Sequence, residues 1–363
     1  MSAFAEPALT ITGLRARAVK APLARPIKTA SGEIPQAPLV LIDIETSGGV
    51  TGSSYLFAYT PLTLKALVAF LDDLAPHLVG EPVAPVAVME KMERLFRLLG
   101  KQGLVGMAMS GVDMALWDAL AKSKNSLLVT LLGGIPRSVP AYDSYGVVDP
   151  RRDAPSIERS LEQGFKAIKI KLGIGSVALD VETVRAVREM IGPDVRLMVD
   201  YNQSLNVTDA LERINAIAGY DIAWIEEPVP AEDLAGHAAV RERSPVPIQT
   251  GENWWFAEGM ANSVNAGASD LVMPDLMKMG GVTGWLKAMG IAQVASLPVS
   301  THLFIETSAH VQIVTPNPHY LEYLDFAGSI LTEPLPVTDG CVVPRGPGIG
   351  IAWDEKAVAR NLI

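Results

Sequence analysis

The chain has 363 residues, of which 49% are hydrophobic and 19% charged, a balance that excludes an intrinsically disordered protein and fits about two globular domains. Its formal net charge is −10, so we expect no general positive field for nucleic acid or an anionic membrane. The single cysteine, Cys341, excludes an internal disulfide framework and fits a cytoplasmic protein, and we expect neither a membrane-spanning helix nor a secretory signal.

The first third of the chain predicts an α+β unit. Leu9–Lys20 and Pro38–Glu45 are rich in β-branched residues and indicate strands, whereas the Pro-, Gly- and Ser-rich segment Arg25–Gln36 between them indicates a loop. Apolar residues recur at helical spacing in Pro61–Val79 and in Met107–Lys122. Strands followed by helices favour a segregated α+β domain.

From Val139 onward, short apolar runs alternate with longer amphipathic stretches. The runs that predict strands are Pro140–Tyr145, Ala167–Leu172, Arg196–Tyr201, Ile222–Glu227, Pro247–Gly251, Leu271–Pro274, Pro298–Leu303 and His319–Leu324. The stretches that predict helices include Ala154–Gln163, Val181–Met190, Asp209–Ala218, Phe256–Ala266 and Gly284–Ala295. Such βα units form a parallel sheet, which is either an open doubly wound sheet or a closed barrel.

Polar side chains at the ends of these runs distinguish the two architectures. Successive runs end in or are followed by Lys169 and Lys171, Asp200 and Asn202, Glu226 and Glu227, Glu252, Asp275, His302, and Glu322. A closed barrel gathers all its strand ends around one mouth, whereas an open sheet spreads them along a line. Helix capping would explain one or two of these residues, such as Asp275, but not the whole set. The pattern therefore favours a barrel.

Three carboxylates predict a metal site. Asp200, Glu226 and Glu252 end successive runs, and three converging anions would repel one another unless a cation lay between them. Oxygen ligands alone suit Mg²⁺ or Mn²⁺ better than Zn²⁺. A glycosidase-like pair of carboxylates is an alternative, but it leaves the third acid without a role.

Lys169 and Lys171 lie two residues apart in a predicted buried strand, so both side chains point the same way, toward the mouth. We expect each lysine to lower the pKa of the other, which would help one of them act as a base. A pair of surface lysines on an edge strand and a Schiff-base lysine are the alternatives.

His302 and Asp275 end neighbouring runs across the predicted mouth from the lysines. A carboxylate beside an imidazole raises the pKa of the imidazole and fixes its tautomer, so the pair predicts a second base. Glu322 follows a further run and could donate a proton or a hydrogen bond. A metal between two bases suits removal of a proton next to a substrate carboxylate, because the metal stabilises the enediolate.

The ordered set of motifs resembles the mandelate racemase subgroup of the enolase superfamily. The matching segments are ITGLRARAV, APLVLIDIETSGGV, SYLFAYTP, GVDMALWDAL, AYDS, GFKAIKIKLG, VDYNQSL, WIEEP, GENWW, MPDLMKMGGVTGWLKA, THLFIETSAH and LEYLDFAGS. The resemblance implies a modified TIM barrel, (β/α)7β, with an N-terminal α+β capping domain. The division it predicts is a cap at residues 1–137, a barrel at 138–325 and a C-terminal segment at 326–363 that returns to the cap.

The resemblance also implies a role for each site residue. Asp200, Glu226 and Glu252 would bind Mg²⁺, Lys171 would be the base for the (S)-face, and His302 with Asp275 would be the base for the (R)-face. Lys169 and Ser144 would bind the substrate carboxylate, Glu322 would share a proton with it, and Asn202 would contact the α-hydroxyl. Relatives of this kind are commonly homo-octamers.

Two features depart from the family pattern. The segment Arg25–Gln36, which shapes the distal pocket in this family, carries Arg25, Lys28 and Glu33, and Tyr145-Gly146 follow AYDS where the resemblance leads us to expect His-Ser. Both changes bear on the substrate and leave the proton-transfer residues intact.

The leading hypothesis is a Mg²⁺-dependent racemase of mandelate or a similar aromatic or hydrophobic 2-hydroxy acid, acting by 1,1-proton transfer through an enediolate. The second is an acid-sugar dehydratase with the same ligands and bases, for which a charged cap would suit a polyol. The third is a non-catalytic protein that binds acidic ligands, although binding alone would need no base on each face. Each takes a small-molecule carboxylate, with no nucleic-acid or membrane partner.

Overall fold

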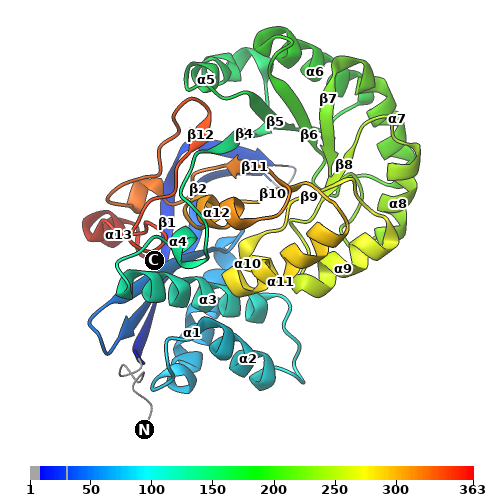
Figure 1. Cartoon of the computed structure of the whole chain (residues 1–363). Helices are drawn as coiled ribbons and strands as arrows, with labels where there is room; N and C mark the ends of the chain where they lie inside the picture. The colour runs from blue at the N-terminus through cyan, green and yellow to red at the C-terminus, as the bar shows by residue number, and fades with distance from the viewer. Residues whose placement is uncertain (1–8, 30–31) are drawn as a thin grey trace.

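The computed structural model describes residues 9–29 and 32–363, which form a cap and a barrel packed side by side (Figure 1). The cap holds a three-stranded antiparallel sheet in the order β1-β2-β3, and three main helices follow it. Its elements are β1 (Ile11–Thr29), β2 (Gly32–Thr46), β3 (Thr51–Phe57), the 3-10 turn η1 (Pro61–Thr63), α1 (Leu64–Leu78), α2 (Pro85–Leu95) and α3 (Leu104–Ser123).

The expectation of a loop at Arg25–Gln36 is wrong, because most of this segment extends the β1–β2 hairpin. Ile27 pairs with Ile34, and Lys28 pairs with Glu33. The prolines that suggested a loop are accommodated because the pairing of β1 with β2 is interrupted by a register shift between Pro22 and Ile27. The hairpin therefore continues from the cap as far as strand β4 of the barrel.

Within the described residues, eight parallel strands close into a barrel, as predicted. They are β4 (Val139–Val147), β5 (Ala167–Lys171), β6 (Arg196–Asp200), β7 (Ile222–Glu226), β8 (Ile248–Thr250), β9 (Leu271–Val272), β10 (Val299–Thr301) and β11 (Pro318–Tyr323). Each strand pairs with the next in sequence, and β11 pairs in parallel with β4, which closes the ring. The short strand β12 (Cys341–Val342) adds to β4 in the antiparallel direction.

Helices follow all barrel strands but the last, which gives the predicted (β/α)7β arrangement. The helical elements of the barrel and its flanks are α4 (Leu128–Leu131), α5 (Pro150–Glu162), α6 (Val177–Ile191), α7 (Val207–Ile217), η2 (Ala218–Tyr220), α8 (Leu234–Arg243), α9 (Phe256–Ala266), α10 (Leu276–Met279), α11 (Gly281–Val294), α12 (Ile305–Val314), η3 (Gly328–Ile330) and α13 (Glu355–Asn361). Helix α12 is buried over most of its length, so it lacks the one-sided apolar pattern that predicted helices such as α6 and α7.

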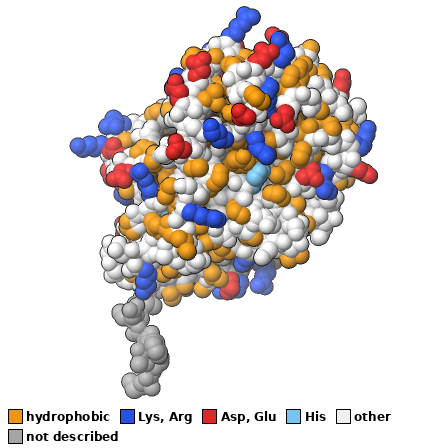
Figure 2. All heavy atoms as spheres, turned by 45° about the horizontal axis from the view of Figure 1, so that its top comes forward, with side chains coloured by type: hydrophobic (Ala, Val, Ile, Leu, Met, Phe, Trp, Pro, Cys, Tyr) orange, Lys and Arg blue, Asp and Glu red, His pale blue; other side chains and the backbone are white. Residues whose placement is uncertain are grey.

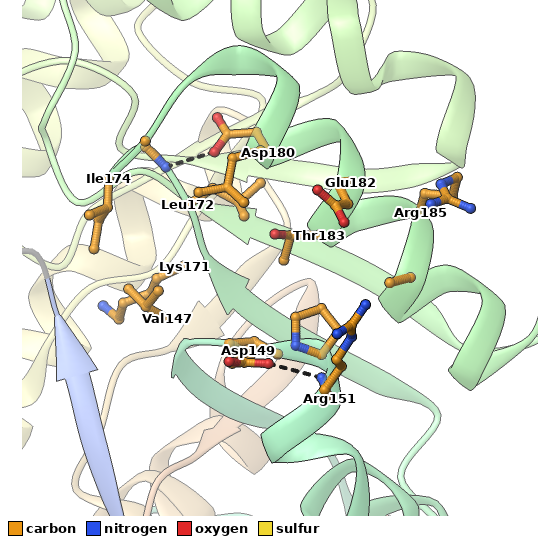
Figure 3. Close-up of a pocket in the computed structure, with 16 residues that line it drawn as sticks. Val147, Asp149, Arg151, Lys171, Leu172, Ile174, Asp180, Glu182, Thr183 and Arg185 are labelled. Carbon is orange, nitrogen blue, oxygen red and sulfur yellow. Dashed lines mark hydrogen bonds between the residues drawn. The ribbon is translucent and has the colours of Figure 1, made fainter.

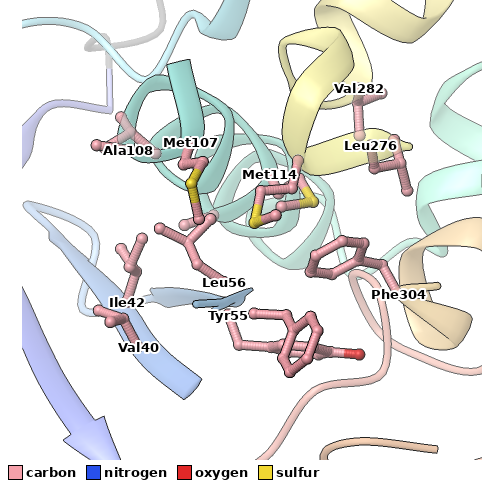
Figure 4. Packing of buried hydrophobic residues seen from close by; sticks show 14 of the residues in the cluster. Val40, Ile42, Tyr55, Leu56, Met107, Ala108, Met114, Leu276, Val282 and Phe304 are labelled. Atoms are coloured by element: carbon pink, nitrogen blue, oxygen red, sulfur yellow. The ribbon is translucent and has the colours of Figure 1, made fainter. Parts of the chain in front are cut away.

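A continuous hydrophobic core joins the cap to the barrel (Figure 4). Ile42 and Leu56 of the cap sheet face Met107 and Met114 of α3, and the buried side chains of Leu276 and Val282 continue the cluster into α10 and α11. The Tyr55 hydroxyl of β3 donates a hydrogen bond of 2.8 Å to Oε2 of Glu306 in α12. The cap is therefore fixed to the barrel by buried contacts.

Helix α3 has, by length and composition alone, the properties of a membrane span. Mean hydropathy over its most apolar window is 1.3, but 78% of that window is buried inside the protein. Such burial is typical of a core helix, and the contacts of α3 with both the cap sheet and the barrel helices agree with that role.

The C-terminal segment returns to the cap. Trp353 Nε1 donates a 2.8 Å hydrogen bond to Asp43 of β2, and Leu362 forms a bridge with Val19 of β1. The boundaries at 137 and 325 remain predictions.

Candidate active site

The three predicted metal ligands lie together at the carboxyl ends of adjacent strands. Asp200 and Glu226 are the last residues of β6 and β7 and pair in register, and Glu252 follows β8. One carboxylate oxygen from each lies within 4.8 Å of the others, and all three side chains are buried. Gly251 makes the turn into Glu252 with a φ of 143°, where an added Cβ would lie 2.9 Å from the backbone of Met273.

The donor set fits a hard dication. Burial raises the pKa of Glu226 well above its usual range, and Asp200 and Glu252 raise it further against the lowering effect of Lys169. Glu226 Oε2 is buried and has no hydrogen-bond partner, an arrangement that is costly unless another group binds this oxygen. Three oxygen ligands of this kind suit Mg²⁺.

Both lysines of β5 reach the mouth, as their spacing predicts. Lys169 Nζ lies 2.6 Å from Glu226 Oε1 and 2.8 Å from Glu322 Oε1, in a fully buried position. Lys171 Nζ lies 2.8 Å from Asp200 Oδ2 and 2.6 Å from Asn202 Oδ1. Each lysine therefore touches a predicted metal ligand.

We expected Lys169 and Lys171 to lower each other's pKa, but the net shift of the pKa is upward for both. Burial lowers the pKa of Lys171 and so does Lys169, but the carboxylates of Asp200 and Glu252 outweigh them and raise it. The pKa of Lys169 is raised well above its usual value, because Glu226 and Glu322 overcome the effect of burial. The carboxylates beside each amine decide the direction of the shift.

His302 follows β10 and is held by two carboxylates. Its Nδ1 lies 2.5 Å from Asp275 Oδ2, and its Nε2 lies 3.1 Å from Glu252 Oε2. Burial lowers the pKa of His302, but Glu252, Glu322 and Asp275 outweigh it and raise the pKa well above the usual value. Leu303 and Phe304, which come next, both have a positive φ, a strained backbone of the kind found beside functional groups.

The order of the strands places the imidazole of His302 across the barrel mouth from the amine of Lys171. Lys171 ends β5 and His302 follows β10, and the strands that carry Asp200, Glu226 and Glu252 lie between them on one side of the ring. Glu322 on β11 and Ser144 on β4 complete the other side. Lys169, His302 and the Ser144 hydroxyl lower the pKa of Glu322 against the raising effect of burial, which holds Glu322 ionised.

Three further polar residues, for which the sequence predicted no role, lie beside the site. Asn253 Nδ2 lies 3.2 Å from Glu252 Oε1 and 2.6 Å from Glu227 Oε2, and Lys278 Nζ donates to Asn253 Oδ1. Burial and the neighbouring Glu252 raise the pKa of Glu227 to about 8. Their signal lay within motifs already identified, GENWW, WIEEP and MPDLMKMGG. Asn253 and Glu227 are next to predicted metal ligands, and Lys278 lies three residues after Asp275.

The side chains meet in a cavity of about 510 Å³ between the mouth and the cap. Lys169, Lys171, Asn202, Glu252, His302 and Glu322 line its barrel side, while the cap and the chain after β11 supply an apolar wall of Ile27, Ile34, Phe57, Leu324 and Phe326. Arg25 and Lys28 do not line this cavity but a neighbouring cleft. The charged residues of the hairpin thus face away from the predicted substrate.

A separate cleft of about 580 Å³ lies between the β4–α5 and β5–α6 connections (Figure 3). Lys171 borders both this cleft and the central cavity, and in Figure 3 its amine points away from the cleft residues Asp180 and Thr183. The amine of Lys171 therefore lies with the other chemistry-bearing groups of the central cavity.

Acidic and basic side chains are interspersed over the face of the molecule that Figure 2 shows, with hydrophobic ones between them. The acidic side chains therefore form no single negative patch on this face.

Two protein-family models match most of the chain. Residues 11–133 match the mandelate racemase / muconate lactonizing enzyme N-terminal domain, and residues 153–357 match the enolase C-terminal domain-like family. A crystal structure described as an enolase from Bradyrhizobium, complexed with magnesium and mandelic acid, superposes with a TM-score of 0.97 at 55% identity, covering 99% of this chain and 100% of that one.

Two curated relatives act on sugar acids or their lactones. D-galactarolactone cycloisomerase of Agrobacterium fabrum is 32% identical, over 96% of this chain and 98% of its own length. L-talarate/galactarate dehydratase of Salmonella typhimurium is 28% identical, over 93% of this chain and 87% of its own length. With both domains matched and the acidic triad in place, the chain belongs to the enolase superfamily, with the mandelate racemase / muconate lactonizing enzyme type of N-terminal domain.

Proposed function

We propose that the protein is a Mg²⁺-dependent racemase of a 2-hydroxy acid with an aromatic or other hydrophobic substituent, mandelate being the best-matched example. The observation that carries the proposal is the composition of the cavity. Two nitrogen bases, Lys171 and His302, border a carboxylate triad, and the wall opposite them is apolar. A substituent without hydroxyl groups suits that wall, since a polyol would leave its hydroxyls unpaired there.

The site contains one group of residues for the metal and another for proton transfer. Asp200, Glu226 and Glu252 would hold Mg²⁺, whose charge stabilises the negative charge that develops on the substrate carboxylate. Lys171 Nζ, in its neutral form, takes the α-proton from the (S)-enantiomer, and the electron pair of the broken C–H bond moves toward the carboxylate. His302 Nε2 then delivers a proton to the opposite face, and the two exchange roles for the (R)-enantiomer.

The other side chains orient the substrate and the bases. Asp275 holds His302 by its Nδ1, which leaves Nε2 toward the cavity. Lys169 and Ser144 bind the substrate carboxylate, and Asn202 contacts the α-hydroxyl. Glu322, which its neighbours hold ionised, shares with that carboxylate a proton that it takes up as the substrate binds. We also propose a cytoplasmic homo-oligomer that acts on small-molecule carboxylates without a nucleic-acid or membrane partner.

The test follows each enantiomer of mandelate separately in D₂O with Mg²⁺, by NMR for α-deuterium and by polarimetry. We expect exchange and loss of optical activity with the wild type. Lys171→Ala should lose exchange from the (S)-enantiomer, and His302→Asn should lose exchange from the (R)-enantiomer while keeping it from the (S). Lys166→Ala, an exposed lysine just before β5, is the matched control. The absence of both exchange and racemisation across a panel of 2-hydroxy acids would reject the proposal.

An acid-sugar dehydratase is the second candidate, favoured by the curated relatives that act on galactarolactone, talarate and galactarate. It would use the same ligands and one base, with an acid to expel the β-hydroxyl. Semicarbazide detection of a keto-acid product across an acid-sugar library distinguishes the two. Turnover of a sugar acid without racemisation of mandelate would favour the dehydratase.

A further inference from the structure

Strand β1 leaves its regular pairing with β2 close to the active site. Pro22 pairs with Gln36, and Ile27 pairs with Ile34. Four residues of β1, Leu23–Pro26, therefore lie opposite the single residue Pro35 of β2. A bulge of this kind turns a side chain out of the sheet. It directs Arg25 away from the cap and toward strand β4 of the barrel.

The Arg25 guanidinium is bound on three sides there. Its Nη2 lies 2.7 Å from Asp143 Oδ1 and 2.8 Å from the carbonyl oxygen of Ser144, and its Nη1 lies 3.1 Å from Asp143 Oδ2. Its Cζ lies 3.6 Å from the centre of the Tyr145 ring. A forked carboxylate pair with stacking on an aromatic face suits arginine and not lysine.

The partners of Arg25 are themselves fixed. Asp143 is 5% exposed and accepts a 2.5 Å hydrogen bond from the Ser160 hydroxyl of α5. The Tyr145 and Ser160 hydroxyls lie 2.6 Å apart. The cap hairpin is therefore tied to a rigid part of the barrel.

A second contact lies a few residues further along the hairpin. Gly146 of β4 packs against the backbone of Lys28, where an added Cβ would lie 2.2 Å from the Lys28 carbonyl oxygen. Between these two contacts is Ile27, which with its pairing partner Ile34 lines the cavity. Arg25, Tyr145 and Gly146, which depart from the family pattern in two separate parts of the sequence, thus meet at one place in the fold.

We propose that Arg25 is a positioning residue: its fork to Asp143 and Ser144 seats Ile27 and Ile34 over the cavity and so sets the preference for a large apolar substituent. The inference rests on the proposed racemase function. Arg25 does not line the cavity, so it acts only through the hairpin. Its loss should affect substrates that reach the apolar wall and spare substrates that do not.

The kinetic test compares mandelate with lactate, whose methyl group is much smaller than the phenyl group of mandelate. In Arg25→Ala, kcat/KM for mandelate should fall about ten- to a hundredfold, mainly through KM, while lactate changes little. Arg25→Lys should restore only part of the loss. Arg152→Ala is the matched control, because Arg152 borders the same neighbouring cleft but pairs with Asp153.

A second measurement needs no activity. Hydrogen exchange at the backbone amides of Ile27 and Ile34 should quicken in Arg25→Ala and in Gly146→Ala, with no change at Lys171. Unchanged exchange in both variants, or equal losses for mandelate and lactate, would overturn the inference. If the wild type racemises neither acid, the proposed function fails, and the exchange result still decides whether Arg25 positions the hairpin.

Discussion

Asp275 performs two tasks with its two carboxylate oxygens. Oδ1 caps α10 by accepting from the backbone N–H groups of Met277 and Lys278, and Oδ2 binds His302 Nδ1. Asp275 therefore caps α10 and also contacts His302, so the two interpretations that the sequence left as alternatives are compatible in the structure. Asparagine caps helices about as well as aspartate but carries no charge.

Asp275→Asn should therefore separate the two tasks. We expect a melting temperature close to that of the wild type, and proton exchange from (R)-mandelate reduced by roughly a hundredfold or more, because His302 loses the group that fixes its tautomer. Exchange from (S)-mandelate, initiated by Lys171, should fall far less. Asp354→Asn, at the cap of α13, is the control. Equal losses for the two enantiomers would contradict the prediction.

His310 gives a pH dependence that lies outside the active site. It is fully buried, accepts from the Val129 N–H at Nδ1, and faces the Arg345 carbonyl oxygen with Nε2. Burial lowers its pKa to about 4 in the folded chain. An unfolded histidine has a pKa of about 6.5, so the folded state favours neutral His310 and its contribution is fully present only above that pH.

The free energy of unfolding should then decline as the pH falls from about 6.5 toward 4, by up to about 3 kcal/mol from this residue. Urea titrations at a series of pH values measure it. In His310→Gln the decline should be smaller by that amount, whatever the variant's stability at neutral pH. His77→Gln, which alters an exposed histidine, should keep the wild-type slope. Parallel curves for wild type and His310→Gln would rule the effect out.

Among the elements, β3 and α3 show how closely the cap packs. An added Cβ at Gly52 of β3 would lie 2.0 Å from the Ala115 carbonyl oxygen of α3, whereas one at Gly290, on the exposed face of α11, would meet nothing within 4 Å. The first glycine is required by a close backbone approach, and the second only weakens its helix.

The same substitution should therefore have opposite effects at these two sites. Gly52→Ala should lower the free energy of unfolding by about 3 kcal/mol, at the upper end for overpacking, because backbone atoms and not a flexible side chain stand in the way. Gly290→Ala should raise it by about 0.5–1 kcal/mol. Chemical denaturation of the two variants checks both signs, and a destabilised Gly290→Ala would show that α11 is constrained there.

The elements that the sequence predicted are those with a local signal. The barrel strands are short apolar runs with polar residues at their carboxyl ends, so both their positions and the shared mouth follow from the sequence. The hairpin at Arg25–Gln36 was missed because its pairing depends on the register with β2, which composition does not reveal. Likewise Ile27 and Phe57 reach the cavity only through the docking of the cap, and no spacing within the barrel predicts them.

For the whole molecule, metal binding and folding should be linked. Asp200, Glu226 and Glu252 come from three strands, so the folded barrel assembles the site and the unfolded chain does not. A ligand at a hundred times its dissociation constant stabilises a protein by about 2.7 kcal/mol. Mg²⁺ should therefore raise the melting temperature of the wild type, and EDTA should reverse the rise.

Glu226→Gln should abolish this response, since Oε2 of Glu226 is the buried oxygen that otherwise has no partner. Asn253→Ala should weaken it, because Asn253 holds the Glu252 carboxylate, and loss of such an outer partner typically costs about 10–100-fold in metal affinity. Calorimetric titration with Mg²⁺ measures both. If Glu226→Gln responded to Mg²⁺ as strongly as the wild type, the assignment of this triad as the metal site would be wrong.

The cavity draws its reactive groups from the barrel and its apolar wall from the cap and the chain after β11. Mutations at positions 27, 34, 57 and 326 can therefore alter which substituent is accepted without disturbing a single proton-carrying atom. A library restricted to those codons would explore new substrates on an intact catalyst, and this separation gives natural selection the same freedom.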